Sequence, residues 1–234
     1  METFVRSVKQ NIEQLGVLRA VLYGASKLLT KVSRGRCALI VYDIVAQPLA
    51  AFAAPADGRP SPFVLTPCQP RDGIIAQFPT DRVPGIFELR FKQGHRCHVL
   101  TKADAFVGFI WLASGHYAED TLRADYQFDA ARAVWDFDLH IEPQYRLSRA
   151  YATLWQQLAQ GLQNDGINWS LSRISAFNPR SLKSQYRAGA RRLGGVTVCR
   201  IGNLELMMCS YRPRFNITWN ARQCPVLKVP VPDA

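Results

Sequence analysis

Two carboxylates and a histidine recur at every second position of one short segment, residues 134–141. Asp136, Asp138 and His140 alternate there with apolar residues. Alternate side chains of a β-strand project to the same face, so the spacing predicts that these three share one face. A carboxylate beside an incoming ammonium can take its proton directly or through a water. We therefore expect Asp136 and Asp138 to act as bases ahead of His140; the structural alternative is that Asp138 pairs with an arginine such as Arg173.

Two arginines flank the turn that follows this segment. A helix is expected over residues 147–162, because apolar residues recur there at helical spacing. The N-terminus of a helix offers free backbone N–H groups and the positive end of its dipole to a phosphate. Arg146 and Arg149 add positive charge, unless they are simply solvated. We therefore expect a phosphate site at this turn.

A second helix is expected to begin at Asn178–Pro179 and to end near Gly189. Proline suits the first helical position, and the asparagine before it suits the capping position. Tyr186 also lies on this helix. Basic residues gather on the helix and just after it: Lys183, Arg187, Arg191 and Arg192.

Strands, hairpins and helices alternate along the part of the chain that must position these residues. Strand-like runs are expected at 63–66, 97–101, 106–112, 134–141, 169–174, 196–201 and 204–209. One hairpin turns at Ala103–Asp104 and another at Gly202–Asn203. Short helical pieces are expected near 73–78 and 85–92. The pattern predicts an α/β chain with a mixed sheet flanked by helices.

The first 36 residues predict a basic amphipathic helix that ends near Gly35. Its apolar stripe comprises Val5, Val8, Ile12, Leu15, Leu18, Leu22, Ala25, Leu29 and Val32. The stripe can pack on the domain, lie on an anionic membrane surface, or form a dimer. A strand over 37–45 and a proline-rich stretch over 46–62 follow. We therefore divide the chain into an extension (1–62), a central domain (63–212) and an irregular tail (213–234).

Composition and charge exclude several classes of protein. Hydrophobic residues make up 48% of the chain, which is enough for a folded core and argues against disorder. The net charge of +11 favours a polyanionic partner. The six cysteines form no C-x-x-C pair and no zinc-like spacing, so we expect reduced thiols, no metal and a cytoplasmic location, peripheral at the inner membrane face if the first helix binds lipid.

Three segments resemble the GNAT superfamily of acyl-CoA-dependent N-acyltransferases, over roughly residues 63–211. DLHIEPQYR (138–146) looks like the family's central strand running into its cofactor loop. SAFNPRSLKSQYRAGARRLG (175–194) looks like its Asn-led helix, and Val107–Gly108–Phe109 matches a common sequence of its third strand. The resemblance implies a GNAT-like central mixed sheet behind an N-terminal helical extension, with acetyl-CoA or another acyl-CoA as the donor.

The resemblance also assigns roles to individual residues. It places the backbone groups of Leu139 and Ile141 against the pantetheine arm and the thioester, and Asn178 against the cofactor. Two departures stand out. The family's pyrophosphate-binding loop corresponds to Arg146, Leu147, Ser148, Arg149, Ala150 and Tyr151, where all of its glycines are replaced. The family's tyrosine, which gives a proton to the leaving thiolate, corresponds to Gln185, so that Tyr186, the candidate proton donor, comes one residue late.

The function expected from these residues is transfer of an acyl group, acetyl by default, from acyl-CoA to a primary amine whose identity the sequence does not reveal. The alternatives are long-chain N-acyl transfer at a membrane surface and a non-catalytic ligand-binding module. Nucleic acid is disfavoured as a partner, because no stacking platform or known motif accompanies the basic residues. The oligomeric state is left open.

Overall fold

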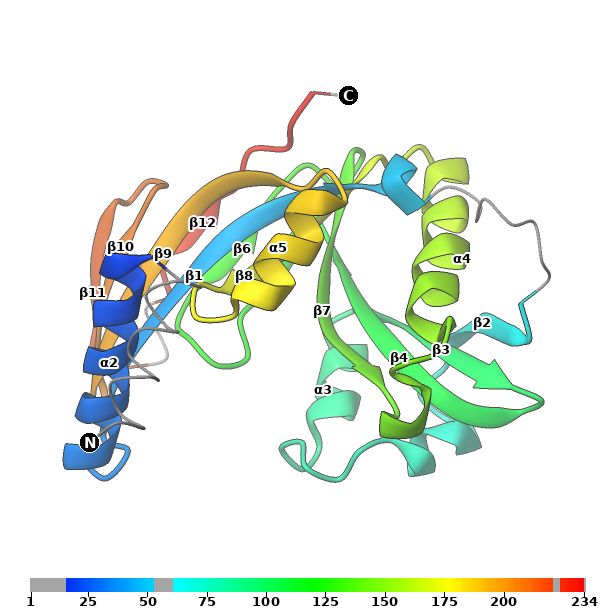
Figure 1. Cartoon of the computed structure of the whole chain (residues 1–234), viewed down its shortest axis with the longest axis horizontal. Helices are drawn as coiled ribbons and strands as arrows, with labels where there is room; N and C mark the ends of the chain where they lie inside the picture. The colour runs from blue at the N-terminus through cyan, green and yellow to red at the C-terminus, as the bar shows by residue number, and fades with distance from the viewer. Residues whose placement is uncertain (1–15, 53–60, 221–223, 234) are drawn as a thin grey trace. The chain divides into compact units, whose positions relative to one another are not determined.

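The computed structural model describes residues 16–52, 61–220 and 224–233. The fold is α/β, with mixed β-sheets flanked by helices (Figure 1). This confirms the predicted fold class. The chain forms two compact units, each built from segments distant in sequence. Unit 1 comprises the described residues of 1–47, 117–128 and 172–230; unit 2 comprises those of 48–116, 129–171 and 231–234.

Unit 2 contains an antiparallel sheet in the order β2-β3-β4-β7. Its strands are β2 (Phe63–Cys68), β3 (Arg96–Lys102), β4 (Ala105–Ser114) and β7 (Ala133–Ile141). The first residues of β8 (Trp169–Ser175) pair in parallel with the start of β7, from Ala133↔Trp169 to Trp135↔Leu171. The β3–β4 turn at Ala103–Asp104 is confirmed, and both residues have positive φ, as a tight hairpin requires.

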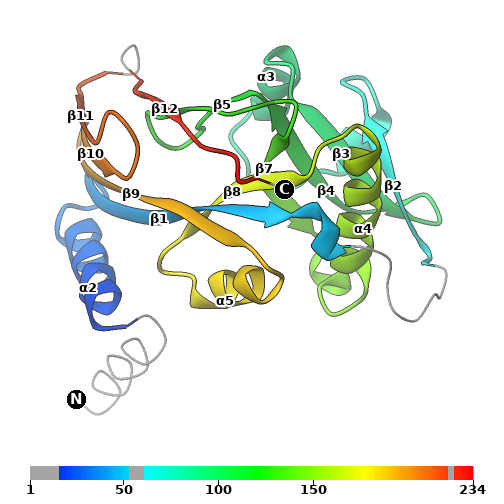
Figure 2. The same ribbon diagram turned by 90° about the horizontal axis from the view of Figure 1, so that it is seen from above.

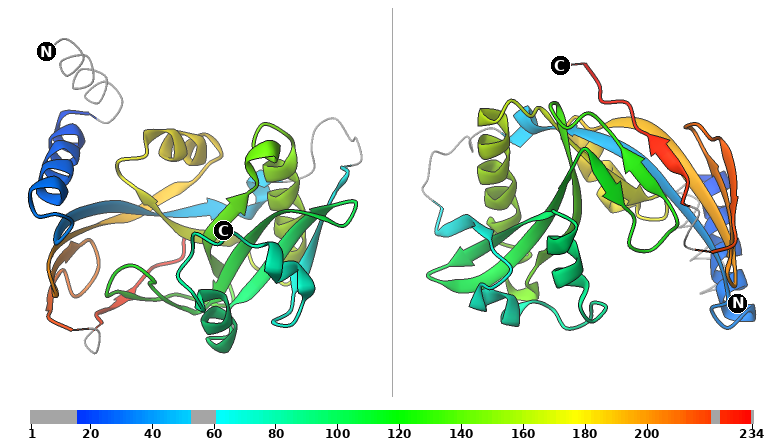
Figure 3. Two further views of the ribbon diagram at one scale, coloured as in Figure 1. Left: turned by 90° about the horizontal axis from the view of Figure 1, so that it is seen from below. Right: turned by 180° about the vertical axis from the view of Figure 1, so that it is seen from behind.

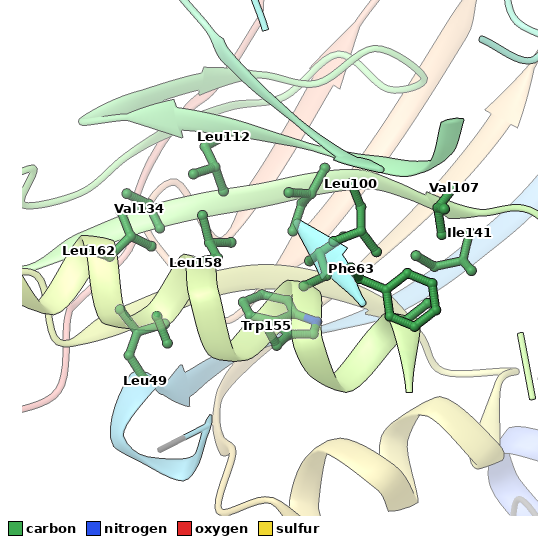
Figure 4. Close-up of a cluster of buried hydrophobic side chains, with 14 of the residues drawn as sticks. Leu49, Phe63, Leu100, Val107, Leu112, Val134, Ile141, Trp155, Leu158 and Leu162 are labelled. Atoms are coloured by element: carbon green, nitrogen blue, oxygen red, sulfur yellow. The ribbon is translucent and has the colours of Figure 1, made fainter. Parts of the chain in front are cut away.

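One face of this sheet is covered by α4 (Ala150–Asn164), which is also contacted by the short 3-10 helix η1 (Leu49–Phe52). Leu154, Leu158 and Leu162 of α4 lie in a buried cluster with Val134 and Ile141 of β7 (Figure 4). These leucines recur at every fourth position, so one stripe of the helix faces the sheet. The helix begins at Ala150, three residues later than predicted.

The opposite face of the unit 2 sheet carries aromatic side chains. The 3-10 helix η2 (Gly73–Gln77) and α3 (Ile86–Lys92) follow β2. The rings in mutual contact on this face are Phe78, Phe87, Phe91, Phe106, Phe109, Trp111 and Phe137. The guanidinium of Arg90 lies over the rings of Phe87, Trp111 and Phe137, 5.1–5.8 Å from their centroids. A cation is thereby held inside an aromatic layer.

Unit 1 contains a sheet in the order β11-β10-β9-β1-β8. Its strands are β1 (Cys37–Pro48), β9 (Arg191–Ile201), β10 (Leu204–Cys209) and β11 (Phe215–Thr218), together with the end of β8. β1 pairs with β9 from Cys37↔Ile201 to Ala46↔Arg191. The predicted hairpin at Gly202–Asn203 is confirmed. The first strand of the chain therefore lies inside the sheet, between β8 and β9.

Different elements cover the two sides of the unit 1 sheet. Figures 2 and 3 show α2 (Val17–Val32) and α5 (Pro179–Arg187) on one side of β1 and β9, and β5 (His116–Ala118), β6 (Asp125–Gln127) and β12 (Val226–Lys228) on the other. The last three form a small sheet in the order β12-β6-β5. This small sheet contacts β1 through Tyr126, whose hydroxyl is hydrogen-bonded to the hydroxyl of Tyr42.

Two expectations about the regular elements are wrong. The segment 213–234 is not wholly irregular, because β11 pairs with β10 and β12 pairs with β6. Residues 114–131, where no strand is expected from the sequence, also contain β5 and β6. Each of β5 and β12 has three residues, too few for a strand periodicity to be visible in the sequence.

The predicted N-terminal helix is described from Gly16 onward; Val5, Val8, Ile12 and Leu15 of its stripe lie outside the described residues. One side of α2 is half-buried, including Leu22, Tyr23 and Ala25, and polar groups also join the helix to the sheet. Arg19 Nη2 lies 2.7 Å from Asp43 Oδ2, and Ser26 Oγ donates to the Leu39 carbonyl at 2.8 Å. No described residue of α2 is buried.

Candidate functional site

The middle of β7 contains a β-bulge at Asp138 and Leu139. Asp138 has φ 44°, and the register with β4 shifts between Phe109↔His140 and Trp111↔Phe137. Ile110 of β4 therefore lies opposite two residues of β7. A bulge of this kind changes which side chains share a face.

The prediction that Asp136, Asp138 and His140 share one face is therefore wrong. Leu139 and Ile141 pack with the α4 cluster, as does Val134 before the bulge. Asp136 lies on the α4 side too, because it follows Val134 by two positions and precedes the bulge. Asp138 instead lies with Arg90 on the aromatic side. The alternation slips by one residue at Asp138, which separates the two candidate bases onto opposite faces.

Asp138 is held by two arginines of its own unit. Arg90 Nη1 lies 2.6 Å from Asp138 Oδ2, and Arg82 Nη2 lies 2.7 Å from Oδ1, with Arg82 Nε also within hydrogen-bond distance. Burial alone would raise the pKa of Asp138, but the hydrogen bonds from Arg82 and Arg90 outweigh it and lower the pKa. Arg173, the partner proposed from the sequence, pairs with Glu119 instead. A carboxylate so stabilised is a weak proton acceptor.

Asp136 has a different environment. Its Oδ1 accepts a hydrogen bond from Ser170 Oγ at 2.6 Å, and its side chain is partly exposed. The pKa of Tyr151 is raised, chiefly by burial of the phenol and then by the Asp136 charge. Asp136 therefore lies beside Ser170 and Tyr151, whereas Asp138 lies between Arg82 and Arg90.

His140 lies near the C-terminal end of β7, on the aromatic face of the sheet. Its ring stacks at 5.6 Å from that of Phe109, and its Nε2 lies 3.0 Å from Glu142 Oε1. These contacts place the imidazole on the face opposite to Asp136.

Gly108 of β4 lies directly against the end of β7. A Cβ built on Gly108 would come 2.2 Å from the carbonyl oxygen of His140 and 2.8 Å from Cδ1 of Ile141. Only glycine therefore permits this approach of the two strands. The Val107–Gly108–Phe109 sequence noted above thus has a local physical reason, which is the close packing of β4 on the bulged strand.

A compact turn joins β7 to α4, through the 3-10 helix η3 (Pro143–Tyr145). Arg146 Nε donates to the Ile141 carbonyl at 3.1 Å, and Ser148 Oγ accepts from the Ala150 amide. Leu147 is fully exposed. The side chain of Arg149, the residue at the N-cap position, makes no capping hydrogen bond to the first turn of α4. The structure thus brings Ile141 and the six predicted loop residues together at the start of a 15-residue helix.

Asn178 caps α5, as predicted. Its Oδ1 accepts from the Ser181 amide at 3.1 Å, and Pro179 follows at the first helical position. Contact with a cofactor stays a prediction.

Tyr186 lies beside a buried carboxylate of unit 1. Its hydroxyl is hydrogen-bonded to Asp43, which also pairs with Arg19 and, at 2.9 Å, with Arg192. Partial burial raises the pKa of Tyr186, and the Asp43 charge raises it further. The neighbouring Gln185 has a buried Oε1 without a hydrogen-bond partner in the described structure. The two side chains therefore differ in environment, as expected for consecutive positions of a helix.

An open cleft of about 460 Å³ lies between α2 and α5. It is lined by apolar side chains, such as Leu182, and by Arg19, Lys183, Tyr186 and Arg187. Sequence reasoning found its α5 residues as a basic patch but missed Arg19 and Asp43. The one signal for Asp43 is that it is the only charged residue in the apolar run 37–45. Nothing local indicated Arg82 or Arg90.

No set of three or more His, Cys, Asp and Glu side chains in the described residues could hold a metal ion. None of the helices in the described ranges is long and apolar enough to cross a membrane.

Comparison with known proteins finds neither a matching family model nor a matching curated protein. Among solved structures, a functionally unknown conserved protein from Staphylococcus epidermidis ATCC 12228 aligns at 9% identity with a TM-score of 0.48, over 75% of this chain and 67% of the other. A tandem GNAT protein from the clavulanic acid biosynthesis pathway aligns at 12% identity with a TM-score of 0.43, over 66% of this chain and 50% of the other.

An aminoglycoside acetyltransferase from an uncultured soil metagenomic sample aligns at 8% identity with a TM-score of 0.37, over 54% of this chain and 86% of the other. The chain thus spans half of the length of the tandem GNAT protein. At these identities and TM-scores the similarity assigns neither an activity nor a substrate to this chain.

Proposed function

We propose that this protein transfers an acyl group, acetyl by default, from acyl-CoA to a primary amine. The observation that carries the proposal is the bulge of β7 at Asp138–Leu139, which is followed, after the short helix η3, by the N-terminus of α4. A bulge takes a backbone group out of the ladder, and a helix N-terminus binds phosphate. A thioester with a pyrophosphate-bearing arm needs both.

The donor would be bound by main-chain groups and arginines of unit 2. The pyrophosphate would lie at the first turn of α4, beside the backbone of Leu147–Tyr151, with Arg146 and Arg149 supplying charge. The pantetheine arm would run along the backbone of Leu139 and Ile141. An amide of this strand would then stabilise the oxyanion, a type of donor whose removal costs about 3 kcal/mol in acyl-transfer enzymes.

The chemistry requires a free amine. The amine nitrogen attacks the thioester carbonyl, a C–N bond forms and the C–S bond breaks, and the thiolate leaves with a proton. Asp136 is our proposed base, because Asp138 is occupied by Arg82 and Arg90. The thiolate would take its proton from Tyr186 or from water, and the raised pKa of Tyr186 favours water. Asn178 would contact the donor in addition to capping α5.

A binding and turnover experiment tests the proposal. Calorimetry should detect CoA and acetyl-CoA, and acetyl-CoA should be hydrolysed or transferred to a member of a panel of primary amines. Asp136→Asn should retain CoA binding and reduce turnover about a hundredfold, the range of general-base catalysis. Binding without turnover for every amine would favour the non-catalytic module, and an absence of CoA binding would refute the donor.

A long-chain donor is the second candidate, favoured by the exposed apolar side chains of α2. Palmitoyl-CoA in the same calorimetry distinguishes it. Tighter binding of palmitoyl-CoA than of acetyl-CoA, together with faster turnover, would make long-chain transfer the activity.

A further inference from the structure

The net positive charge of the protein comes from only one of its two units. The residues assigned to unit 1 include 19 Lys and Arg against 7 Asp and Glu, a net charge of +12. Those assigned to unit 2 include 10 against 11, a net charge of −1. A surface that attracts polyanions therefore belongs to unit 1.

Unit 1 also carries an apolar stripe that no described residue covers. Val17, Val21, Leu28 and Val32 of α2 are spaced by four, seven and four positions, which places them on one side of the helix. Between 63% and 76% of each of these side chains is exposed. The helix contacts its own sheet through a different side, which includes Arg19 and Ser26. We refer to Val17, Val21, Leu28 and Val32 as the α2 stripe.

β10 and the edge strand β11 of the same sheet add further exposed apolar side chains. Met208 of β10 and Phe215 and Ile217 of β11 are more than half exposed. Met208 pairs with Thr197 of β9, and Thr197 pairs with Val41 of β1 across the adjacent strands. Paired residues of a sheet project to the same face. Val41 precedes by two positions the carboxylate that binds α2, so Met208 lies on the side of the sheet that carries α2.

Lysines flank the α2 stripe. Lys27 and Lys31 directly precede Leu28 and Val32, about 100° around the helix, and both are exposed. On α5, Lys183 and Arg187 are exposed and have no ion-pair partner within the described ranges. Figures 2 and 3 show α5 on the same side of the sheet as α2. Apolar and cationic side chains therefore share this side of unit 1.

We propose that α2 docks unit 1 on the surface of an anionic lipid bilayer, lying in the plane of the interface. Helices that bind in this way combine an apolar face with lysines along its border, and both are present here. A nucleic acid would use the cations and leave the stripe bare. A second copy of the chain would have to bury lysines, which the cores of protein interfaces exclude.

Vesicle co-sedimentation of the full-length protein tests the proposal. The wild type should sediment with vesicles of phosphatidylcholine and phosphatidylglycerol in equal parts, but not with phosphatidylcholine alone, and added salt should weaken the binding. Val21→Ser/Leu28→Ser should weaken binding by tenfold or more. The matched control is Val83→Ser/Leu89→Ser, the same residue types exposed in unit 2, which should bind as the wild type does.

The charge contribution has its own pair of variants. Lys27→Gln/Lys31→Gln should reduce binding about tenfold, because each cation near an anionic surface contributes to affinity. Lys92→Gln/Lys102→Gln, which removes the same charge from unit 2, should have no effect. Circular dichroism should show equal melting temperatures for all four variants, because the substituted side chains are exposed.

Three results would overturn the proposal. The first is a wild type that does not sediment with anionic vesicles. The second is a stripe variant that binds as tightly as its unit 2 control. The third is a wild-type dimer, measured by light scattering, that Val21→Ser/Leu28→Ser converts to a monomer without altering sedimentation, which would assign the α2 stripe to a second copy.

Discussion

Asp138 accepts a 2.6 Å hydrogen bond from Arg90, a residue 48 positions earlier whose side chain is only 5% exposed. Arg82 pairs with the other carboxylate oxygen. Asp138→Asn would remove the negative charge that pairs with Arg82 and Arg90 beside the aromatic layer. We expect a loss of about 3 kcal/mol in the free energy of unfolding, as for a broken buried ion pair.

The matched control is Asp81→Asn. Asp81 also pairs with Arg82, but 71% of its side chain is exposed. Exposed pairs contribute little, so we expect a change below about 1 kcal/mol. Urea denaturation measures both variants, and equal losses would contradict the structural role of Asp138.

The same carboxylate predicts a pH dependence. Its pKa is lowered on folding, so the unfolded chain binds the proton more tightly. The stabilisation is therefore complete above the unfolded pKa, about 4, and is lost as pH falls through the lower folded value. The difference in unfolding free energy between the wild type and Asp138→Asn should shrink below about pH 4. A difference that grows on acidification would contradict the direction of the shift.

Gly108→Ala should destabilise unit 2. The new Cβ would overlap the carbonyl oxygen of His140, which is backbone and cannot move aside as a flexible side chain can. We expect a cost of about 2 kcal/mol or more. Gly161→Ala, in α4, has no atom within 4 Å of the added Cβ and should stabilise the protein by about 0.5–1 kcal/mol. Thermal melts that rank the two variants in the opposite order would refute this account of the β4–β7 contact.

Arg146→Ala/Arg149→Ala should weaken CoA binding by tenfold or more, corresponding to about 1.4 kcal/mol. The reason is the loss of two positive charges at the start of α4, where the pyrophosphate is proposed to bind. Arg71→Ala/Arg96→Ala removes the same charge from exposed positions of unit 2 and serves as the control. An unchanged CoA dissociation constant in calorimetry for the first variant would exclude this placement of the pyrophosphate.

Tyr186→Phe should retain most turnover once an acceptor is found. The hydroxyl of Tyr186 is hydrogen-bonded to Asp43, and its raised pKa makes it a reluctant proton donor. Asp43 keeps Arg19 and Arg192 in the variant, so folding should be preserved. A loss of several hundredfold at unchanged stability, measured with saturating acyl-CoA, would instead establish Tyr186 as the general acid.

Deletion of residues 1–35 should leave a folded protein with a lower melting temperature. It removes α2, which contributes no buried residue but pairs with Asp43. Deletion of residues 1–62 should cause aggregation, because it also removes β1 and exposes the ladders of β8 and β9. Size-exclusion chromatography and melting curves compare the two. A monomeric, cooperative product of the longer deletion would show that β1 is dispensable, as a separable extension over 1–62 would require.

Local features of the protein were readable from the sequence alone. The turn at Ala103–Asp104, the capping of α5 by Asn178 and the apolar register of α4 depend on residues within a few positions of one another. Periodicity and capping chemistry report such short-range interactions directly. The alternation of strands and helices was predicted for the same reason, and with it the mixed α/β class.

The site was decided by contacts between distant residues. Strict alternation along 134–141 placed both carboxylates on one face, but Gly108 and Ile110 of β4 accommodate an extra residue of β7, and Asp138 turns to the other face. Its arginines come from 48 and 56 positions away and have no signature near it. The sequence alone determined which residue types could do chemistry. The tertiary structure decided which of them face each other, because register, bulges and buried ion pairs arise only when strands distant in sequence meet.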